Sequence, residues 1–214
     1  MIDPTSLKNE LQNIICGQVK NGKGELVKTT QTYLGKSFET GSGAEKKKYS
    51  RQQEEESLRD YISGNNLWIS SDVFGTYITE GAEQKVYFPE GADDVIKISD
   101  AVFYVFWLDY FNNLLIHNYL FPDTAYTLIG FHDSGGTLFA VLKQPFIEST
   151  EMTNLDNVKQ FMLSNGFLQK KNNDYYHPYL GIIIEDLHDE NVLTNKGVLF
   201  FTDTVIYITE EFYK

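Results

Sequence analysis

The 214-residue sequence has one cysteine, four histidines and five prolines. A single cysteine, Cys16, excludes an intramolecular disulfide and is typical of a protein in a reducing compartment. The sequence contains no His-Glu-x-x-His motif and no cysteine cluster, so it does not predict a zinc site. No pattern pairs Cys16 with a general base, which argues against nucleophilic catalysis by this thiol.

Long apolar runs are also missing, and no signal peptide is visible in the first residues of the sequence. The most apolar stretch, residues 101–121, contains an aspartate, three asparagines and a histidine, which is too polar for a membrane span. The first ten residues lack the basic segment and the apolar segment that mark a signal peptide. We therefore expect a cytoplasmic protein that has no membrane partner.

Positive charge is scarce in this sequence. It has 18 Lys and Arg against 30 Asp and Glu, a net charge of −12, which argues against nucleic acid as a partner of the whole surface. Residues 1–52 are more basic, with nine Lys and Arg against five Asp and Glu. The run Lys46–Lys48 lies in a Gly- and Ser-rich stretch, residues 35–52, which predicts a flexible linker or an exposed loop. We expect these lysines to be solvated, and contact with nucleic acid is the alternative. We divide the chain into an N-terminal extension, residues 1–51, and a domain, residues 52–214.

Three strands are predicted near the start of the domain. Hydrophobic residues make up 42% of the chain and aromatic residues 14%, which is enough for a folded core. Residues 76–88 predict two strands joined by a turn at Gly81, and residues 95–99 predict a third. Lys97 lies between two isoleucines, so it points to the opposite face of that strand. The alternatives are an ordinary hairpin glycine at Gly81 and a solvent-facing lysine on an edge strand.

A long helix is predicted to follow, over residues 101–120, with Asp100 as its N-cap. One stripe of this helix is polar and comprises Asp109, Asn112, Asn113 and His117. Two strands come next, residues 126–133 and 137–147, and Pro145 is expected to end the second.

Three further segments of the sequence are candidates for helices. Residues 5–17 have helical spacing, whereas the period of residues 25–34 does not distinguish a helix from a strand. A further helix can be capped by Asn154 or Asp156 and is ended by the Asn-Gly pair at residues 165–166.

Three oxygen-bearing side chains lie at the ends of apolar strands in residues 182–203. Asp186 follows an isoleucine run, Asn191 precedes a short strand, and Asp203 follows the next strand. Charge beside buried strands is costly unless a cation balances it. Carboxylate and amide oxygens are ligands of Mg²⁺, which takes its other ligands from water and phosphates. The stretch therefore predicts a magnesium–phosphate site, with ordinary strand-end turn residues as the alternative and His188 as a supporting residue.

The order of these features resembles the protein-kinase-like fold. The Asp-Leu-His-x-x-Asn form of the loop is more similar to aminoglycoside and choline kinases than to the His-Arg-Asp form of eukaryotic protein kinases. Over residues 52–210 the chain is most similar to the kinase domain of bacterial polyvalent proteins of mobile elements. The segments that carry this similarity are EGAEQKVYF, VIKISD, LLIHNYLFPDTAYTLIGF, LKQPFI and EDLHDENVL.

The resemblance implies an α+β fold and a phosphotransferase that uses ATP and magnesium. It implies an N-lobe, residues 52–143, with a five-stranded antiparallel sheet and one long helix. A hinge, residues 144–146, and a reduced C-lobe, residues 147–214, would follow. The phosphate acceptor would be a small molecule or a protein.

The resemblance also implies a role for each candidate residue. Asp186 would accept the proton of the attacking hydroxyl, and Asn191 and Asp203 would hold magnesium. Lys97 would bind the α- and β-phosphates. The nucleotide would also be bound by the main chain of the turn at Gly81 and of the hinge from Gln144 to Phe146.

The chain departs from the kinase pattern in four respects. The glycine-rich turn has one central glycine, and the Asp-Phe-Gly position reads Asp203-Thr204-Val205. Residues 101–121 contain no glutamate to pair with the lysine, and Asp109 is the nearest acidic substitute. Eleven residues follow Asp203. These departures leave open a catalytically inactive pseudokinase, acting as a nucleotide-binding or interaction module, and an enzyme that transfers the nucleotidyl group.

Overall fold

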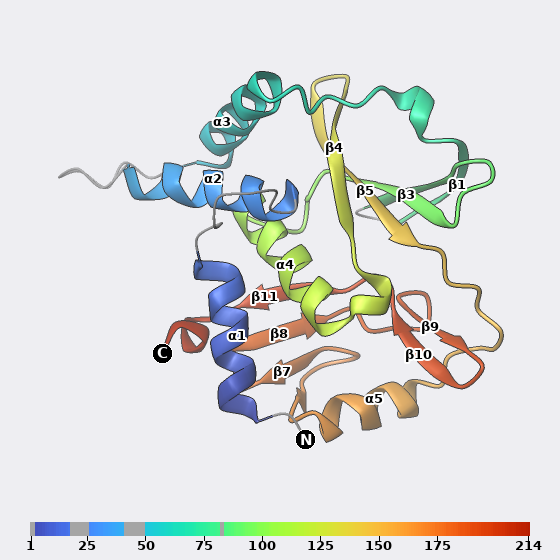
Figure 1. Ribbon diagram of the computed structural model, residues 1–214. Coiled ribbons are helices and arrows are strands. Elements are labelled where there is room, and N and C mark those ends of the chain that lie inside the picture. Colours follow the sequence, from blue (N-terminus) through green and yellow to red (C-terminus); the bar gives the residue numbers. More distant parts are fainter. Residues whose placement is uncertain (1–2, 18–25, 41–49, 82–83) are drawn as a thin grey trace. The chain divides into compact units, whose positions relative to one another are not determined.

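The computed structural model describes residues 3–17, 26–40, 50–81 and 84–214, which form an α+β fold (Figure 1). The chain divides into two compact units. The first unit comprises Met1–Gly17, Leu115–Ala125 and Ile147–Lys214, and the second comprises Gln18–Leu114 and Tyr126–Phe146. Helix α1 (Pro4–Cys16) belongs to the first unit, whereas α2 (Leu26–Thr40) and α3 (Arg51–Gly64) belong to the second.

The sequence period of residues 25–34 does not distinguish a helix from a strand. The structure shows that residues 26–34 are helical and belong to α2. This helix continues to Thr40 and so includes the first residues of the stretch that was predicted as a linker. Residues 41–49, which carry the lysine run, lie outside the described residues. None of the helices that the structure describes has the length and apolar character needed to cross a lipid bilayer.

A five-stranded antiparallel sheet with the order β1-β2-β3-β5-β4 forms the centre of the second unit, as predicted. Its strands are β1 (Thr76–Glu80), β2 (Gln84–Phe88), β3 (Asp94–Ser99), β4 (Thr127–Ser134) and β5 (Thr137–Pro145). Strand β5 ends at Pro145, as expected for a residue that has no N–H to continue the ladder.

The two faces of β3 have different surroundings. Ile96 and Ile98 belong to an apolar cluster on one face, and Lys97 points to the other. Only 6% of Lys97 is exposed, and its Nζ lies 5.6 Å from the ring centroid of Tyr126. Strand β3 is the central strand of the sheet. The alternative of a solvent-facing lysine on an edge strand is therefore wrong.

The long helix begins later than predicted. Helix α4 spans Trp107–Leu120, and the expected start at residue 101 with Asp100 as N-cap is wrong. Ala101 has a φ of 54°, a left-handed conformation that cannot continue into a right-handed helix. The Asp100 carboxylate accepts a hydrogen bond from the backbone N–H of Val102 instead.

A carboxylate from a different helix caps α4. Glu54 of α3 is fully buried and accepts hydrogen bonds from the backbone N–H groups of Trp107, at 2.7 Å, and Leu108, at 3.0 Å. The Asp109 carboxylate accepts one from the N–H of Phe106. These N–H groups have no partner within the helix, and the negative charges match the positive end of its dipole. Asp109, the substitute that we considered for pairing with the lysine, is thus an N-terminal capping residue.

Arg51, three residues before Glu54 in α3, holds the segment that leads into α4. Its guanidinium donates hydrogen bonds to the carbonyl oxygens of Asp100, at 2.8 Å, Ala101, at 3.0 Å, and Tyr104. It also lies over the ring of Trp107, 5.7 Å from the centroid. The first turn of α3 therefore fixes both the irregular segment and the start of α4.

The first unit contains a four-stranded sheet, β11-β8-β7-β6, and a two-stranded one, β10-β9. Its strands are β6 (Leu168–Gln169), β7 (Tyr175–His177), β8 (Ile182–Glu185), β9 (Val192–Asn195), β10 (Val198–Phe201) and β11 (Val205–Ile208). Helix α5 (Leu155–Ser164) is capped by Asn154 and ends at Asn165, as predicted. A short 3₁₀ turn, Glu210–Tyr213, follows β11 and packs against α1.

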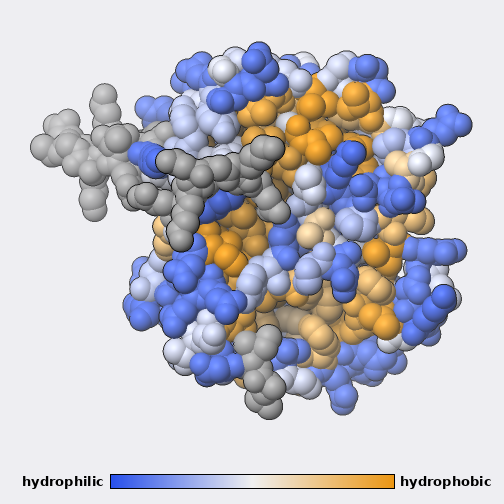
Figure 2. Space-filling view, viewed as in Figure 1, coloured by the Kyte–Doolittle hydropathy of each residue, from blue (hydrophilic) through white to orange (hydrophobic). Residues whose placement is uncertain are grey.

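Hydrophilic residues cover much of the molecular face drawn in Figure 2, with apolar patches between them. Among the described large apolar side chains, Met152, at 87%, and Val105, at 70%, are the most exposed. Single exposed apolar side chains are common on folded proteins and by themselves indicate no partner.

The buried cap of α4 predicts a pH-dependent stability. Burial raises the pKa of Glu54 to about 7, although the N–H groups of Leu108 and Trp107 and the charge of Arg51 oppose this shift. The folded state therefore holds the Glu54 proton more tightly than the unfolded state. Stability should fall as pH rises from about 4.5 to 7, by about 1.4 kcal/mol for each unit of pKa difference.

Glu54→Gln, which mimics the protonated acid, should flatten this part of the pH dependence. Urea unfolding of both proteins between pH 4.5 and 8 measures it, and the exposed Glu56→Gln serves as the control. If the wild type and Glu54→Gln show the same slope with pH, the Glu54 carboxyl does not carry the effect.

Candidate functional site

The loop between β8 and β9 is a tight turn that begins at Asp186. Asp186 has a φ of 67°, which is sparsely populated by residues other than glycine and is often found at functional sites. Its N–H is held by the Asp174 carboxylate at 3.2 Å. The N–H of His188 donates to the Asp186 carbonyl at 2.9 Å, and that of Asn191 to the His188 carbonyl at 3.1 Å. These bonds return the chain so that Asn191 faces Asp186.

Asn191 links the two aspartates of the candidate site. Its Nδ2 donates to the backbone oxygen and to the carboxylate Oδ2 of Asp186, each at 2.9 Å. Its own carbonyl oxygen accepts hydrogen bonds from the backbone N–H groups of Thr202, at 2.9 Å, and Asp203, at 3.2 Å. The structure therefore brings together Asp186, Asn191 and Asp203, all within the first unit.

His188 supports the same arrangement. Its Nε2 lies 3.3 Å from Asp186 Oδ1 and 3.1 Å from Asn191 Nδ2. The Asp186 side chain nevertheless remains 57% exposed, so its carboxylate is open to a reacting group. The position of His188 agrees with its interpretation as a supporting residue.

The donor atoms of this site suit magnesium better than zinc. In the described part of the chain, no three His, Cys, Asp or Glu side chains converge as in a protein-only metal centre. Because Nδ2 of Asn191 is turned to Asp186, its Oδ1 is the acceptor end of the amide. Together with the Asp203 carboxylate it offers two hard oxygen ligands. Mg²⁺ uses one or two protein ligands and fills its octahedron with water and phosphate oxygens, so these residues fit it.

The hairpin formed by β9 and β10 is fastened to the segment that follows β5. The backbone N–H of Thr150 donates to the Thr194 carbonyl at 3.0 Å, and Asn195 Nδ2 to the Glu148 carbonyl at 2.7 Å. The N–H of Gly197 donates to the Glu151 carboxylate at 2.8 Å. Asn191 and Asp203, which lie at the two open ends of this hairpin, are thus carried on an anchored element.

In the second unit, Lys97 lies on a buried face of the sheet, between two apolar residues of the neighbouring strands. Its cross-strand neighbours on that face are Val86 of β2 and Leu142 of β5. Gln144 pairs with Val95, so its side chain is on the same face as Lys97, and it is 1% exposed. Lys97 and Gln144 therefore share one side of β3 and β5, whereas the order of features in the sequence identifies Gln144 only as a hinge residue.

Two backbone N–H groups that were expected to contact a nucleotide already have partners. The N–H of Gly81 donates to the Gln84 carbonyl at 2.9 Å, and that of Phe146 donates to the Asp93 carbonyl at 3.0 Å. A Cβ added at Gly81 would meet no described atom within 4 Å, so the fold does not require glycine there for space. This finding favours the alternative of an ordinary hairpin residue at Gly81.

The sequence matches a known family over residues 51–210, which is most of the chain. That family is described as the serine/threonine/tyrosine kinase found in polyvalent proteins. The chain belongs to this kinase family. The match confirms the resemblance seen in the motifs, and a search among curated proteins finds no match.

Several residues that support the candidate site were not identified from the sequence. Asp174 holds the N–H of Asp186, and the Thr202 hydroxyl donates to the Asn191 carbonyl at 3.1 Å. Asp174 lies 12 positions before Asp186, across β7 and β8, and no local motif marks that distance. The acidic surroundings also affect Glu185: burial and the charge of Asp174 raise the pKa of its carboxyl.

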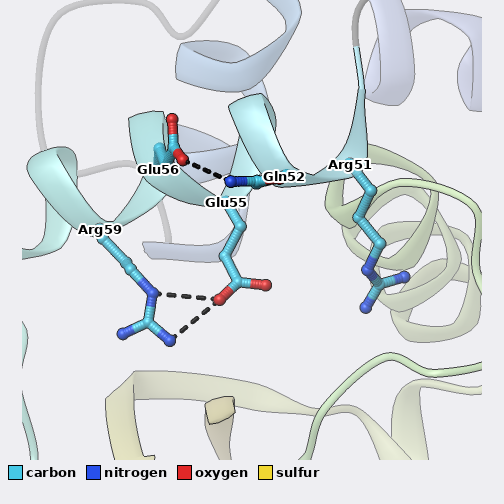
Figure 3. Close-up of a pocket in the computed structure, with 5 residues that line it drawn as sticks. All are labelled: Arg51, Gln52, Glu55, Glu56 and Arg59. Atoms are coloured by element: carbon cyan, nitrogen blue, oxygen red, sulfur yellow. Dashed lines mark hydrogen bonds and ion pairs between the residues drawn. The ribbon is translucent and has the colours of Figure 1, made fainter. Parts of the chain in front are cut away.

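A pocket of about 430 Å³ lies on α3, in the second unit (Figure 3). It is lined by Arg51, Gln52, Glu55, Glu56 and Arg59. Figure 3 shows Arg59 reaching Glu55, with two bonds of 3.0 and 2.9 Å, and Gln52 reaching Glu56. Arg59 also pairs with Asp133 at 2.7 Å. Arg59 is thus neutralised by Glu55 and Asp133, and Arg51 is bonded to backbone carbonyls, so we interpret the pocket as a structural surface of α3.

Asn191→Asp should destabilise the protein more than Asn191→Ala. Both changes remove the donor to Asp186, but the aspartate also places a second carboxylate beside the first. We expect an added loss of about 1 kcal/mol at pH 7, limited by screening at this exposed site. Repulsion raises the pKa of one carboxyl in the variant, so the difference should disappear toward pH 4. Urea titrations at both pH values measure it, and an equal difference at the two values would contradict the contact.

Proposed function

We propose that this kinase-family chain is an ATP- and magnesium-dependent phosphotransferase. The observation that carries the proposal is the hydrogen bonding of Asn191, which holds Asp186 on one side and Asp203 on the other. Phosphoryl transfer needs positioned charges and ligands more than covalent chemistry from the protein. Asp186 would take a proton, and Asn191 and Asp203 would offer two oxygen ligands to a metal, which would meet this requirement.

The roles follow from the chemistry of each group. The exposed Asp186 carboxylate would orient the attacking hydroxyl of the acceptor and take its proton. Asn191 Oδ1 and the Asp203 carboxylate would hold magnesium, which supplies neutralisation of the phosphate charge when it is bound. Lys97, buried between Val86 and Leu142, would bind the α- and β-phosphates, and Gln144 would line the space for the base. The acceptor is a small molecule or a protein.

Thermal-shift titration tests nucleotide binding by the wild type. A ligand that binds only the folded state stabilises it by RT ln(1 + [L]/Kd), about 2.7 kcal/mol at a concentration of 100 Kd. We expect millimolar ATP with magnesium to raise the Tm. Absence of any shift at that concentration would refute the proposal.

Asp203→Ala should remove the magnesium-dependent part of this stabilisation, because it deletes a charged metal ligand. The same titration with and without magnesium measures it. Asp189→Ala is the matched control, since Asp189 is an exposed aspartate of the same loop. If both variants keep the wild-type response to magnesium, Asp203 is not a ligand.

Asp186→Ala should leave nucleotide binding intact and abolish turnover, because its carboxylate acts on the acceptor and not on the nucleotide. Phosphate transfer from labelled ATP to panels of small molecules and proteins measures the loss. Turnover by Asp186→Ala at the wild-type rate would remove Asp186 from the mechanism. Mass spectrometry of the products also separates transfer of phosphate from transfer of the nucleotidyl group.

A non-catalytic nucleotide-binding or interaction module is the second candidate. It is favoured by the internal hydrogen bonds of the Gly81 and Phe146 N–H groups, which leave these donors engaged within the fold. Nucleotide binding without turnover on either acceptor panel would support this candidate over the first.

A further inference from the structure

His117 is a buried histidine whose hydrogen bonds define the tautomer of its neutral ring. It lies in α4, within the first unit, and is fully buried. Its Nε2 is 3.1 Å from the carbonyl oxygen of Thr124, and its Nδ1 is 2.8 Å from the hydroxyl of Thr204. A carbonyl oxygen can only accept, so Nε2 carries the proton and donates to Thr124. In the neutral ring Nδ1 is then the acceptor for the Thr204 hydroxyl.

A second connection joins the same region to the other side of Asp203. The Thr124 hydroxyl donates to the carbonyl oxygen of Phe201 at 2.6 Å. The ring of Phe121 stacks on that of Phe201, with centroids 4.4 Å apart. The end of α4 and the 3₁₀ turn after it, Pro122–Thr124, thus contact the chain before Asp203 as well as after it.

These contacts complete the fixation of Asp203. The N–H groups of Thr202 and Asp203 donate to Asn191, and the next side chain, Thr204, is bonded to His117. The direction of the Asp203 carboxylate depends on the backbone of this turn. A hydrogen bond to a buried histidine therefore secures the position at which the kinase pattern Asp-Phe-Gly has an aromatic residue.

We propose that His117 is a positioning residue for Asp203: through the Thr204 hydroxyl it holds the turn in the conformation that presents the carboxylate to magnesium. This proposal has two steps. The conformational step, in which the bond between His117 and Thr204 holds the turn, concerns the ligand-free protein and does not depend on the proposed function. The magnesium step, in which the turn presents the Asp203 carboxylate to magnesium, rests on the proposed function.

Thr204→Val tests the conformational step, because it removes the hydroxyl with little change in shape. Amide hydrogen exchange of Thr202 and Asp203 in the ligand-free protein reports whether their bonds to Asn191 still form. Loss of a buried hydrogen bond should speed this exchange by about fivefold to tenfold. Thr209→Val is the matched control, since it removes a hydroxyl bonded to the Gly181 carbonyl in the same unit. Unchanged exchange in Thr204→Val, or an equal change in both variants, would overturn the proposal.

Two substitutions at His117 separate positioning from packing. His117→Leu removes both bonds, whereas His117→Asn keeps an acceptor near the place of Nδ1 and can still bind the Thr204 hydroxyl. We expect His117→Asn to recover part of the exchange protection that His117→Leu loses. If the two variants exchange alike at Thr202 and Asp203, His117 contributes only volume to the core and the proposal fails.

The magnesium step is tested by the affinity for ATP with and without magnesium, measured by calorimetry. In the wild type magnesium should increase the affinity, and in Thr204→Val this gain should shrink by about fivefold to tenfold while the magnesium-free affinity stays the same. An undiminished gain in Thr204→Val would overturn the magnesium step. If the wild type itself binds no nucleotide, the proposed function fails, and faster exchange in Thr204→Val would still support the conformational step.

Discussion

The candidate site depends on the hydrogen bonds of Asn191. Its Nδ2 donates hydrogen bonds to the backbone oxygen and to Oδ2 of Asp186. Its backbone carbonyl accepts hydrogen bonds from the N–H groups of two consecutive residues, Thr202 and Asp203. The link to Asp186 needs the side-chain donor of an asparagine, whereas the carbonyl that accepts from Thr202 and Asp203 belongs to the backbone. The donor end of the amide neutralises part of the charge beside Asp186, and its Oδ1 is the acceptor that the proposed function assigns to magnesium. An aspartate at this position would repel its neighbour, and an alanine would leave the loop without its link.

Helix α4 imposes a second constraint, since polar groups are buried at both of its ends. At its start Glu54 and Asp109 satisfy N–H groups that the helix cannot, and at its end His117 satisfies a carbonyl and a hydroxyl. Burying a carboxylate is costly, and the raised pKa of Glu54 shows that cost. The polar stripe read from the sequence is therefore not a solvated face. Asn112, in its middle, accepts a hydrogen bond from Gln31 of α2 at 3.0 Å.

Local sequence patterns predicted those parts of the fold whose conformation is determined by residues that are close in sequence. Strict alternation placed Lys97 opposite its isoleucines, and the turn chemistry of Asn154 and Asn165 placed the ends of α5. The spacing of the three polar residues in 182–203 identified side chains that the fold brings together. Prediction failed where a distant partner decides. The cap of α4 comes from Glu54, 53 positions before Trp107, and nothing in the intervening sequence marks that contact.

The departure of Asp203-Thr204-Val205 from the kinase pattern has a physical reading in the fold. An aromatic residue after the metal-binding aspartate would be held by apolar packing, which depends on a cavity of matching shape. A threonine at this place is held by a directional bond to the fully buried His117, and burial makes that bond costly to leave unmade. Thr204, at the place where the kinase pattern has an aromatic residue, and His117 in the polar stripe of α4 are then two parts of one arrangement. Directional fixation of the turn is compatible with a functional site, so Thr204 alone is no argument that this member of the family is inactive.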